Sequence, residues 1–288
     1  MKGNDDVTAR EAVLARLRER RAAGGAIVVA GVGSGLTAAA AAAGGADALA
    51  CYGTAAYRIL GVPTALAFLP YDDTNALTLE LVPTIVERAG ATPVIAGLGA
   101  HDPRRSLERL VDAAATAGAA GVTNEPFVAI YGPALRAELE AAGYGFGREV
   151  ALLQAAARRG LLTLGWAFDE EEVRRLLGAG VDVVGAMAGI TGGRTAGGEP
   201  AEPAAEAAAR LGSMVEVART ARADAIVLLH GGPLGDPASV GEALAATRAD
   251  GYVTGSSAER SPVFAAVRDV VAAFRRLPSG PRHARGSA

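Results

Sequence analysis

Short apolar runs recur eight times along this chain, and each is followed by a stretch long enough for one helix. The runs are rich in Val, Ile, Leu and Ala, and they end at Gly, Pro or a polar residue. They occupy residues 26–32, 47–52, 92–98, 120–124, 161–167, 181–187, 225–230 and 250–255. Near-continuous hydrophobicity indicates strands that are buried on both faces, as in a parallel sheet covered by helices. The sequence therefore predicts an α/β fold.

Eight strand and helix units in 288 residues favour a closed (β/α)8 TIM barrel, with a doubly wound open sheet as the alternative. We predict an N-terminal helix within residues 1–25, a single barrel domain over 26–277 and a disordered tail at 278–288. A ninth apolar run, 64–70, is interpreted as a short extra strand after the second barrel strand. The Gly-rich and Pro-rich stretch 194–200 follows a predicted strand, and it is a candidate lid.

Composition restricts the kind of partner. The formal net charge is only −3, so no surface is predicted to bind nucleic acid or a membrane. Cys51 is the only cysteine, which excludes an internal disulfide and suits a reducing compartment. The first residues lack the apolar segment of a secretory signal, and no apolar run is long enough to cross a bilayer. We therefore expect a cytoplasmic protein that acts on small molecules.

Lysine is nearly absent, and this excludes two kinds of chemistry. The sole lysine is Lys2, near the start of the chain. Schiff-base catalysis and pyridoxal phosphate both need a buried lysine amine, so neither is expected. The sequence also lacks the GxxxxGK[ST] phosphate loop and a nicotinamide-binding motif.

Glycine-rich turns follow the first, sixth, seventh and eighth predicted strands, at the end where TIM barrels bind their ligands. Free backbone amides in such turns bind anions, including phosphate. The candidate anion-binding residues are Ser34, Gly35, Gly192, Gly193, Gly231, Gly232, Gly255 and Ser256. For the first of these turns, a tight connection from strand to helix is an equally good explanation.

Polar side chains at the strand ends supply candidate catalytic groups. His230 ends the seventh run and is the best group for proton transfer near neutral pH. Asn124 and Glu125 stand at the end of the fourth run, where they are candidates for a substrate clamp or for metal ligands, and a turn from strand to helix is an equally good explanation. Arg260 is a candidate for binding a substrate anion, and pairing with Glu259 is the alternative.

Ten ordered blocks of sequence resemble the phosphoenolpyruvate hydrolase-like TIM-barrel family, from about Thr8 to Leu277. They are EAVLARLR, GVGSGLTA, GGADALACY, LPYDDTNAL, PVIAGLGAHDP, GVTNEP, GYGFGREV, GITGGRT, LLHGGP and GSSAERSPV. This family is similar in turn to the phosphoenolpyruvate mutase and isocitrate lyase superfamily, whose members make or break C–C or C–P bonds of α-keto acids. The resemblance implies a hydrolase or lyase that acts on a small α-keto or enol acid, with or without a phosphate group, and forms a homo-oligomer.

The resemblance also implies roles for individual residues. The segment Asp73-Thr74-Asn75 looks like the superfamily loop that places an aspartate near the metal-bound substrate, although a helix cap would also explain Asp73. Asp73 and His230 would move protons, Asn124 would polarise the substrate, and Arg260 with the glycine-rich rim would hold the anion. Residues that match the family pattern are Arg58, Asp73, Asn75, Asp102, Asn124, His230, Ser257, Glu259 and Arg260.

Departures from the pattern affect the metal and the activity. Gly97 and Gly99 stand where superfamily lyases carry magnesium-binding aspartates, so Mg²⁺ is doubtful and Glu125 and Asp73 are its candidate ligands. Other polar positions of close relatives are also replaced, by Ala39, Gly53, Ala56 and Ala186. These losses support an alternative function, in which the barrel senses a ligand or binds a partner and has little catalytic activity. The resemblance to the barrel domain of a plant virus-resistance protein points the same way.

Overall fold

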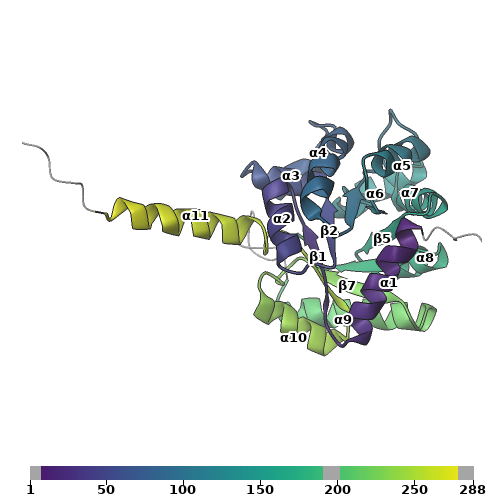
Figure 1. Ribbon diagram of the computed structural model, residues 1–288. Coiled ribbons are helices and arrows are strands. Elements are labelled where there is room, and N and C mark those ends of the chain that lie inside the picture. Colours follow the sequence, from purple (N-terminus) through teal and green to yellow (C-terminus); the bar gives the residue numbers. More distant parts are fainter. Residues whose placement is uncertain (1–7, 191–201, 278–288) are drawn as a thin grey trace, which may run out of the picture.

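The eight apolar runs form one closed parallel barrel in the computed structural model, which describes residues 8–190 and 202–277 (Figure 1). The strands pair in chain order, and β8 returns to β1, with Ile27 opposite Gly251. The strands are β1 (Ile27–Gly31), β2 (Ala48–Cys51), β3 (Val94–Gly97), β4 (Gly121–Thr123), β5 (Leu162–Ala167), β6 (Val183–Met187), β7 (Ile226–His230) and β8 (Gly251–Thr254). The (β/α)8 prediction is therefore confirmed.

Helices flank the strands, and most of them form the outer layer of the barrel (Figure 1). They are α1 (Ala9–Ala22), α2 (Gly35–Ala43), α3 (Gly53–Ile59), α4 (Thr74–Ala89), α5 (Leu107–Thr116), α6 (Pro133–Ala141), α7 (Phe146–Arg158), α8 (Glu170–Gly178), α9 (Ala204–Ala221), α10 (Pro237–Thr247) and α11 (Arg260–Arg275), with the 3-10 helices η1 (Thr64–Phe68) and η2 (Val128–Ile130). Several begin at a side-chain cap, as Asp169 accepts from Glu172 N at 2.8 Å. No helix in the described ranges is both long and apolar enough to cross a bilayer.

Alternation along each strand divides the core into two parts. Successive side chains of a strand point to opposite faces, so every second residue lies inside the barrel. Leu162, Leu164 and Trp166 of β5 belong to the inner core. On β7, Leu228 is likewise an inner residue, and His230 continues the same face at the strand end. The inner face thus changes from aliphatic to functional side chains at the C-terminal end of the barrel.

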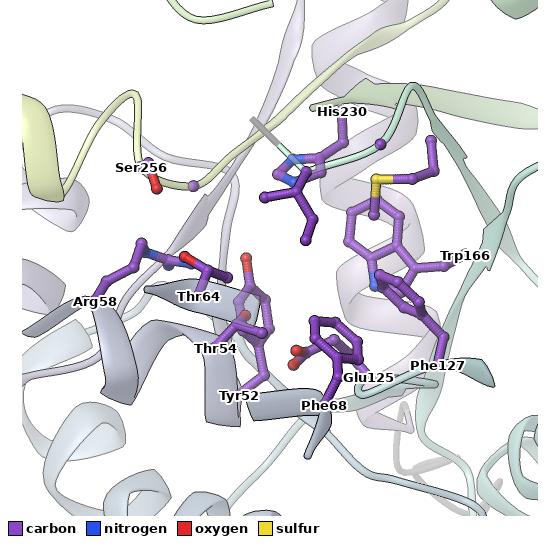
Figure 2. Close-up of a pocket in the computed structure, with 14 residues that line it drawn as sticks. Tyr52, Thr54, Arg58, Thr64, Phe68, Glu125, Phe127, Trp166, His230 and Ser256 are labelled. Carbon is purple, nitrogen blue, oxygen red and sulfur yellow. The ribbon is translucent and has the colours of Figure 1, made fainter. Parts of the chain in front are cut away.

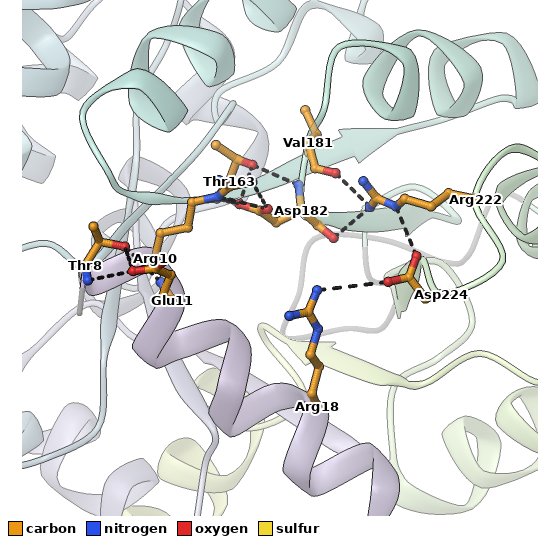
Figure 3. Close-up of polar contacts among 9 residues, drawn as sticks. All are labelled: Thr8, Arg10, Glu11, Arg18, Thr163, Val181, Asp182, Arg222 and Asp224. Carbon is orange, nitrogen blue, oxygen red and sulfur yellow. Dashed lines mark hydrogen bonds and ion pairs between the residues drawn. The ribbon is translucent and has the colours of Figure 1, made fainter. Parts of the chain in front are cut away.

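Helix α1 packs on the opposite, N-terminal end of the barrel, where its Arg10 contacts Asp182 (Figure 3). Val13, Leu14 and Leu17 are buried and pack against the inner core. Arg10 Nη2 donates to Asp182 Oδ1 at 2.6 Å, and this ion pair ties the helix to the start of β6. The N-terminal helix therefore shares the hydrophobic core of the barrel.

The prediction of a short extra strand after β2 is wrong. The apolar run at 64–70 is not an extra strand, because Thr64–Phe68 forms the 3-10 helix η1 after Pro63. In the closed barrel β2 is already paired with both β1 and β3, so no strand edge is free to accept another strand there. Thr64, Ala67 and Phe68 of η1 are buried, and the run covers the C-terminal end of the barrel.

The last helix, α11, does not pack on the barrel. It extends away from the other elements (Figure 1), and none of its residues is buried. Its apolar side chains are largely exposed, including Phe264 at 57%, Val267 at 59% and Val271 at 60%. An amphipathic helix normally buries its apolar stripe, so this face lacks a partner within the described part of the chain.

Candidate active site

A cavity lies at the C-terminal end of the barrel, where TIM barrels place their active sites (Figure 2). We call it the mouth cavity. Its lining residues are Tyr52, Thr54, Arg58, Thr64, Phe68, Glu125, Phe127, Trp166, Met187, Gly189, Ile190, His230, Gly255 and Ser256. In Figure 2, Tyr52, Arg58 and Thr64 lie across the cavity from Phe127 and Trp166, so a polar side faces an aromatic side.

Glu125 supplies a carboxyl group to the lining of the mouth cavity. The residue lies two positions after the end of β4 and is 3% exposed. Neither carboxyl oxygen forms a hydrogen bond of normal geometry with a described residue, although Thr54 lies near. Burial raises the pKa of Glu125 to about 7, against the opposing effects of Thr54 and Arg58. Both protonation states are thus accessible near neutral pH, as proton transfer to and from a substrate requires.

Arg58 supplies a buried guanidinium from α3. Its Nε donates to Glu259 Oε2 at 2.9 Å. Glu259 Oε1 accepts from Gly33 N and from Thr37 Oγ1, both at 2.7 Å, so the loop after β8 is tied to the turn after β1. The Tyr52 hydroxyl lies near the guanidinium, but Arg58 Nη2 is buried and has no hydrogen bond of normal geometry to any described residue. This nitrogen is a donor for an anionic ligand.

His230 presents a neutral imidazole to the mouth cavity. Its Nδ1 lies 2.6 Å from the carbonyl oxygen of Val253. A carbonyl only accepts, so Nδ1 carries the proton and Nε2 is left as an acceptor. Burial lowers the pKa of His230 to about 4, and the nearby Arg58 acts in the same direction, so the ring is uncharged at neutral pH.

Asn124, predicted to polarise the substrate, lies outside the mouth cavity. Its Oδ1 accepts from Trp166 N at 2.7 Å, and its Nδ2 donates to Glu149 of α7. Asn124 and Glu125 are successive residues, and only Glu125 lines the mouth cavity. In this structure Asn124 therefore holds the backbone of Trp166 in place.

Asp73, Asn75 and Asp102 come together in a neighbouring cavity, together with Arg105. Asp73 caps α4 by accepting from Ala76 N at 2.9 Å, and it also pairs with Arg105. Asn75 Nδ2 donates to Asp102 Oδ2 at 3.1 Å, and Asp102 accepts from Arg105 Nε at 2.7 Å. This cluster fixes the loop after β3 to the start of α4.

The predicted anion-binding residues divide into several groups. Gly255 and Ser256 line the mouth cavity. Ser34 caps α2 by accepting from Thr37 N at 3.2 Å, and Gly35 begins that helix. Gly192, Gly193 and the candidate lid at 194–200 lie outside the described residues.

Gly231, Gly232, Ser257 and Arg260 do not line the mouth cavity either. Gly231 adopts a φ of +80°, and a side chain there would meet the carbonyl oxygen of Gly189, so glycine is required for this close approach. Arg260 Nη2 donates to the carbonyl oxygen of Val62 at 2.6 Å. In this structure Arg260 therefore holds the segment that leads into η1.

The aromatic residues that line the mouth cavity were not predicted. Tyr52, Phe127 and Trp166 are 2–4% exposed, and all three line the cavity. A search for polar residues after each strand passes over them. Strand alternation is the signal that identifies Trp166, because it stands two and four residues beyond the inner residues Leu164 and Leu162.

The donor set of the mouth cavity does not fit a divalent metal ion. Within residues 8–190 and 202–277, no three His, Cys, Asp or Glu side chains are grouped in a way that could hold an ion. Glu125 lines the mouth cavity, whereas Asp73 lines the neighbouring one. A β-carbon at Gly97 would lie 2.3 Å from Tyr52 Cβ, so the Tyr52 side chain occupies the space of an aspartate there. Hard cations need several oxygen ligands, and here the cavity offers one carboxylate.

An Asp73→Asn variant separates capping from catalysis. We expect it to keep most of the turnover and to lose less than about 1 kcal/mol of stability, because asparagine still caps α4 and the Arg105 pair is partly exposed. Turnover and the free energy of unfolding should be measured on the same preparation. A large loss of turnover at unchanged stability would instead give Asp73 the functional role that the family resemblance implies.

Comparison with known proteins identifies the family. The model of the phosphoenolpyruvate hydrolase-like family matches residues 12–277. The chain is 32% identical over 269 residues to the ToMV resistance protein Tm-1(GCR237) of Solanum lycopersicum, covering 93% of this chain and 36% of that protein. It thus spans about a third of the length of this tomato relative.

Solved structures share the fold. A phosphonopyruvate hydrolase in complex with oxalate and Mg²⁺ has a TM-score of 0.64 and 20% identity, over 94% of this chain and 92% of that chain. A 2,3-dimethylmalate lyase of the phosphoenolpyruvate mutase and isocitrate lyase superfamily has a TM-score of 0.60 and 23% identity, over 96% and 92%. On the family match and the shared barrel, this chain belongs to the phosphoenolpyruvate hydrolase-like family.

Proposed function

We propose that this protein is a hydrolase or lyase that acts on a small 2-keto acid through its enolate. The observation that carries the proposal is the buried Glu125 carboxyl, with a pKa of about 7, in a cavity that also holds the guanidinium of Arg58. The comparisons support the reaction class, because the similar structures include a hydrolase and a lyase, one of them with bound oxalate. Oxalate has the planar shape and the oxygen arrangement of the enolate of a 2-keto acid.

The proposed binding mode uses two buried donors. Arg58 Nη2 would bind the substrate carboxylate. Trp166 Nε1 is also buried without a hydrogen-bond partner among the described residues, and it would donate to the oxygen at C2, where negative charge develops. An unpaired buried donor costs stability, so both nitrogens gain from a ligand oxygen.

The proposed proton transfers assign one role to each titratable group. In the cleavage direction, the substrate is a 2-keto acid whose C3 is bonded to a carbon that carries a hydroxyl group. His230 Nε2 takes the proton of that hydroxyl group. The bond between C3 and that carbon breaks, its electron pair forms the enolate, and the leaving fragment becomes a carbonyl compound. Protonated Glu125 then delivers its proton to C3 and gives the keto acid. After the products leave, His230 would release its proton to solvent and Glu125 would take one up from solvent, which restores both groups. In the reverse direction, the Glu125 carboxylate would remove a proton from C3.

Hydrogen exchange tests the proposal without knowledge of the leaving fragment. The protein is incubated in D2O with pyruvate, 2-oxobutanoate or 4-methyl-2-oxopentanoate, with EDTA or with Mg²⁺, and deuterium at C3 is followed by proton NMR. We expect exchange above the buffer rate with EDTA present, and no enhancement with Glu125→Gln. Glu172→Gln is the matched control, since Glu172 is a buried glutamate outside the mouth cavity. Exchange that is absent throughout would contradict the proposal.

Ligand binding without turnover is the second candidate function. It is favoured by Gly97, where Tyr52 fills the space of a metal-binding side chain. It predicts that a keto acid raises the melting temperature by mass action while no exchange at C3 is detected. The same preparation and the same acids used for the exchange experiment decide between the two functions.

We also propose that the protein is a homo-oligomer joined through α11. A groove bordered by Arg58, Ile59 and Glu259 on one side and by the apolar face of α11 on the other is open in the single chain. The α11 helix of a second copy carries the same apolar face, and a two-fold pairing would bury both. The groove reaches the Arg58–Glu259 pair, so assembly would also exclude water from behind the mouth cavity.

Light scattering after size-exclusion chromatography measures this assembly. We expect an oligomer for the unmodified chain and a monomer for Val267→Lys, because Val267 lines the groove and a charge there opposes burial. Asp269→Lys is the control, since Asp269 is on α11 but does not line the groove. A monomeric unmodified chain at micromolar concentration would contradict the proposal.

A further inference from the structure

We infer that the mouth cavity selects 2-keto acids that carry one carboxylate and an aromatic or branched apolar substituent. This inference rests on the proposed function and specifies its substrate class. It starts from the division of the cavity into two sides (Figure 2). The two sides make different demands on a ligand, and together they describe one kind of molecule.

The polar side offers charge compensation for a single anionic group. Among the described lining residues, Arg58 is the only one with a permanent positive charge. Glu259 accepts from its Nε at 2.9 Å, which leaves Nη2 to bind one further anionic group. The imidazole of His230 is neutral, since burial lowers its pKa to about 4. A phosphonate or a second carboxylate would therefore be buried without a counter-charge, which is unfavourable.

The opposite side offers a continuous apolar surface. Phe127 is 4% exposed, and its ring centroid lies 6.5 Å from that of Trp166 and 5.1 Å from that of Phe68. Met187 and Ile190 complete this side. Burial of apolar ligand surface against these side chains is favourable, and the rings can receive a flat substituent in an edge or offset arrangement.

Phe68 marks the place where such a substituent would lie. It belongs to η1, packs on Phe127 and lines both the mouth cavity and the neighbouring cavity. Its segment is held by hydrogen bonds to backbone carbonyls, from Tyr131 to Phe68 and from Arg260 to Val62. The Phe68 ring is 7% exposed and fills part of the apolar side in this structure, so the apolar group of a substrate would have to take its place.

Tryptophan fluorescence provides a direct measurement, because Trp166 is the only tryptophan of the chain and lines the mouth cavity. The full chain is titrated in EDTA with 4-methyl-2-oxopentanoate, 4-phenyl-2-oxobutanoate, oxaloacetate and phosphonopyruvate, and calorimetry confirms each Kd. We expect the two apolar acids to bind at least tenfold more tightly than the two acids with a second anionic group.

Two variants locate the preference in the apolar side. Phe127→Ala should reduce the preference about tenfold, and Phe68→Ala should tighten binding of 4-phenyl-2-oxobutanoate. Leu135→Ala is the control, because Leu135 is 45% exposed on α6 and outside the mouth cavity. Leu135→Ala should leave the Kd of each of the four acids unchanged.

The outcomes separate this inference from the proposed function. Tighter binding of oxaloacetate or phosphonopyruvate, or a preference unchanged by Phe127→Ala, would overturn the inference and leave the enolate chemistry intact. Preferential binding of the apolar acids without deuterium exchange at C3 would support the selectivity and overturn the enzymatic function. No binding by any of the four acids would overturn the inference.

Discussion

Replacement of Glu125 by glutamine should abolish turnover and, at pH 8, make the protein more stable. Glutamine keeps the shape of the side chain but neither gives up nor takes a proton, so a loss of at least about 100-fold in rate is expected. The activity of the unmodified protein should change around pH 7, where Glu125 titrates. His230 adds no second transition between pH 5 and 9, because its pKa is about 4.

The gain in stability follows from the raised pKa of Glu125. Its folded value of about 7 lies above the ordinary 4.5, so between these values the folded chain holds a proton that the unfolded chain has released. Stability from this group is full below pH 4.5 and falls as the pH rises to 7. The loss is about 3 kcal/mol, and glutamine avoids it.

Chemical denaturation of both proteins at pH 4.5 and pH 8 measures this effect. The difference in unfolding free energy should be near zero at pH 4.5 and should favour Glu125→Gln at pH 8. Because only one group differs, the pH dependence of all other groups cancels in the comparison. A variant that is less stable than the unmodified protein at pH 8 would show that Glu125 is held as a carboxylate.

Arg58→Met should lower the free energy of unfolding by about 3–5 kcal/mol. The Arg58 and Glu259 side chains are 3% and 2% exposed, so the substitution leaves a carboxylate buried without its ion-pair partner. Binding of keto acids should be lost as well, since Arg58 Nη2 is the proposed carboxylate donor. Denaturant titration and calorimetry measure the two effects separately.

A double variant and a surface control show whether the stability loss of Arg58→Met comes from the buried, unpaired charge. Adding Glu259→Gln to Arg58→Met removes the unpaired charge and should recover part of the stability without restoring binding. Arg159→Met breaks an ion pair with Asp112 in which both side chains are more than half exposed, and it should cost at most about 1 kcal/mol. Equal costs for the two arginines would contradict the importance of burial at Arg58.

The barrel was predictable from the sequence because its strands are buried on both faces. That burial gives eight continuous apolar runs, each followed by a helix. The run at 64–70 has the same composition, but strand formation also needs a free edge, which a closed barrel lacks. The apolar composition of a segment indicates that it is buried, but it does not indicate which element the segment packs against.

Part of the candidate site was predictable from the rule that TIM barrels place their functional residues at the C-terminal ends of the strands. Looking at strand ends placed Glu125, His230 and Gly255 in the mouth cavity. The same rule included Asn124, although its amide contacts Glu149 and Trp166 outside the cavity. The placement of Asp73 in a different cavity depends on how the segment after β2 folds over the barrel, which strand periodicity does not determine.

The pairing of β1 with β8 has a consequence for how the protein is made. Ile27 lies opposite Gly251, so the first and last strands that close the barrel are separated by nearly the whole domain. Contacts of such long separation form slowly and carry a large entropic cost. During synthesis, β1 to β7 must wait with an open edge until residues 251–254 have emerged. Until β8 is synthesised, the unpaired strand edge can form non-native strand pairings. A chaperone would therefore have its largest effect on folding before β8 emerges.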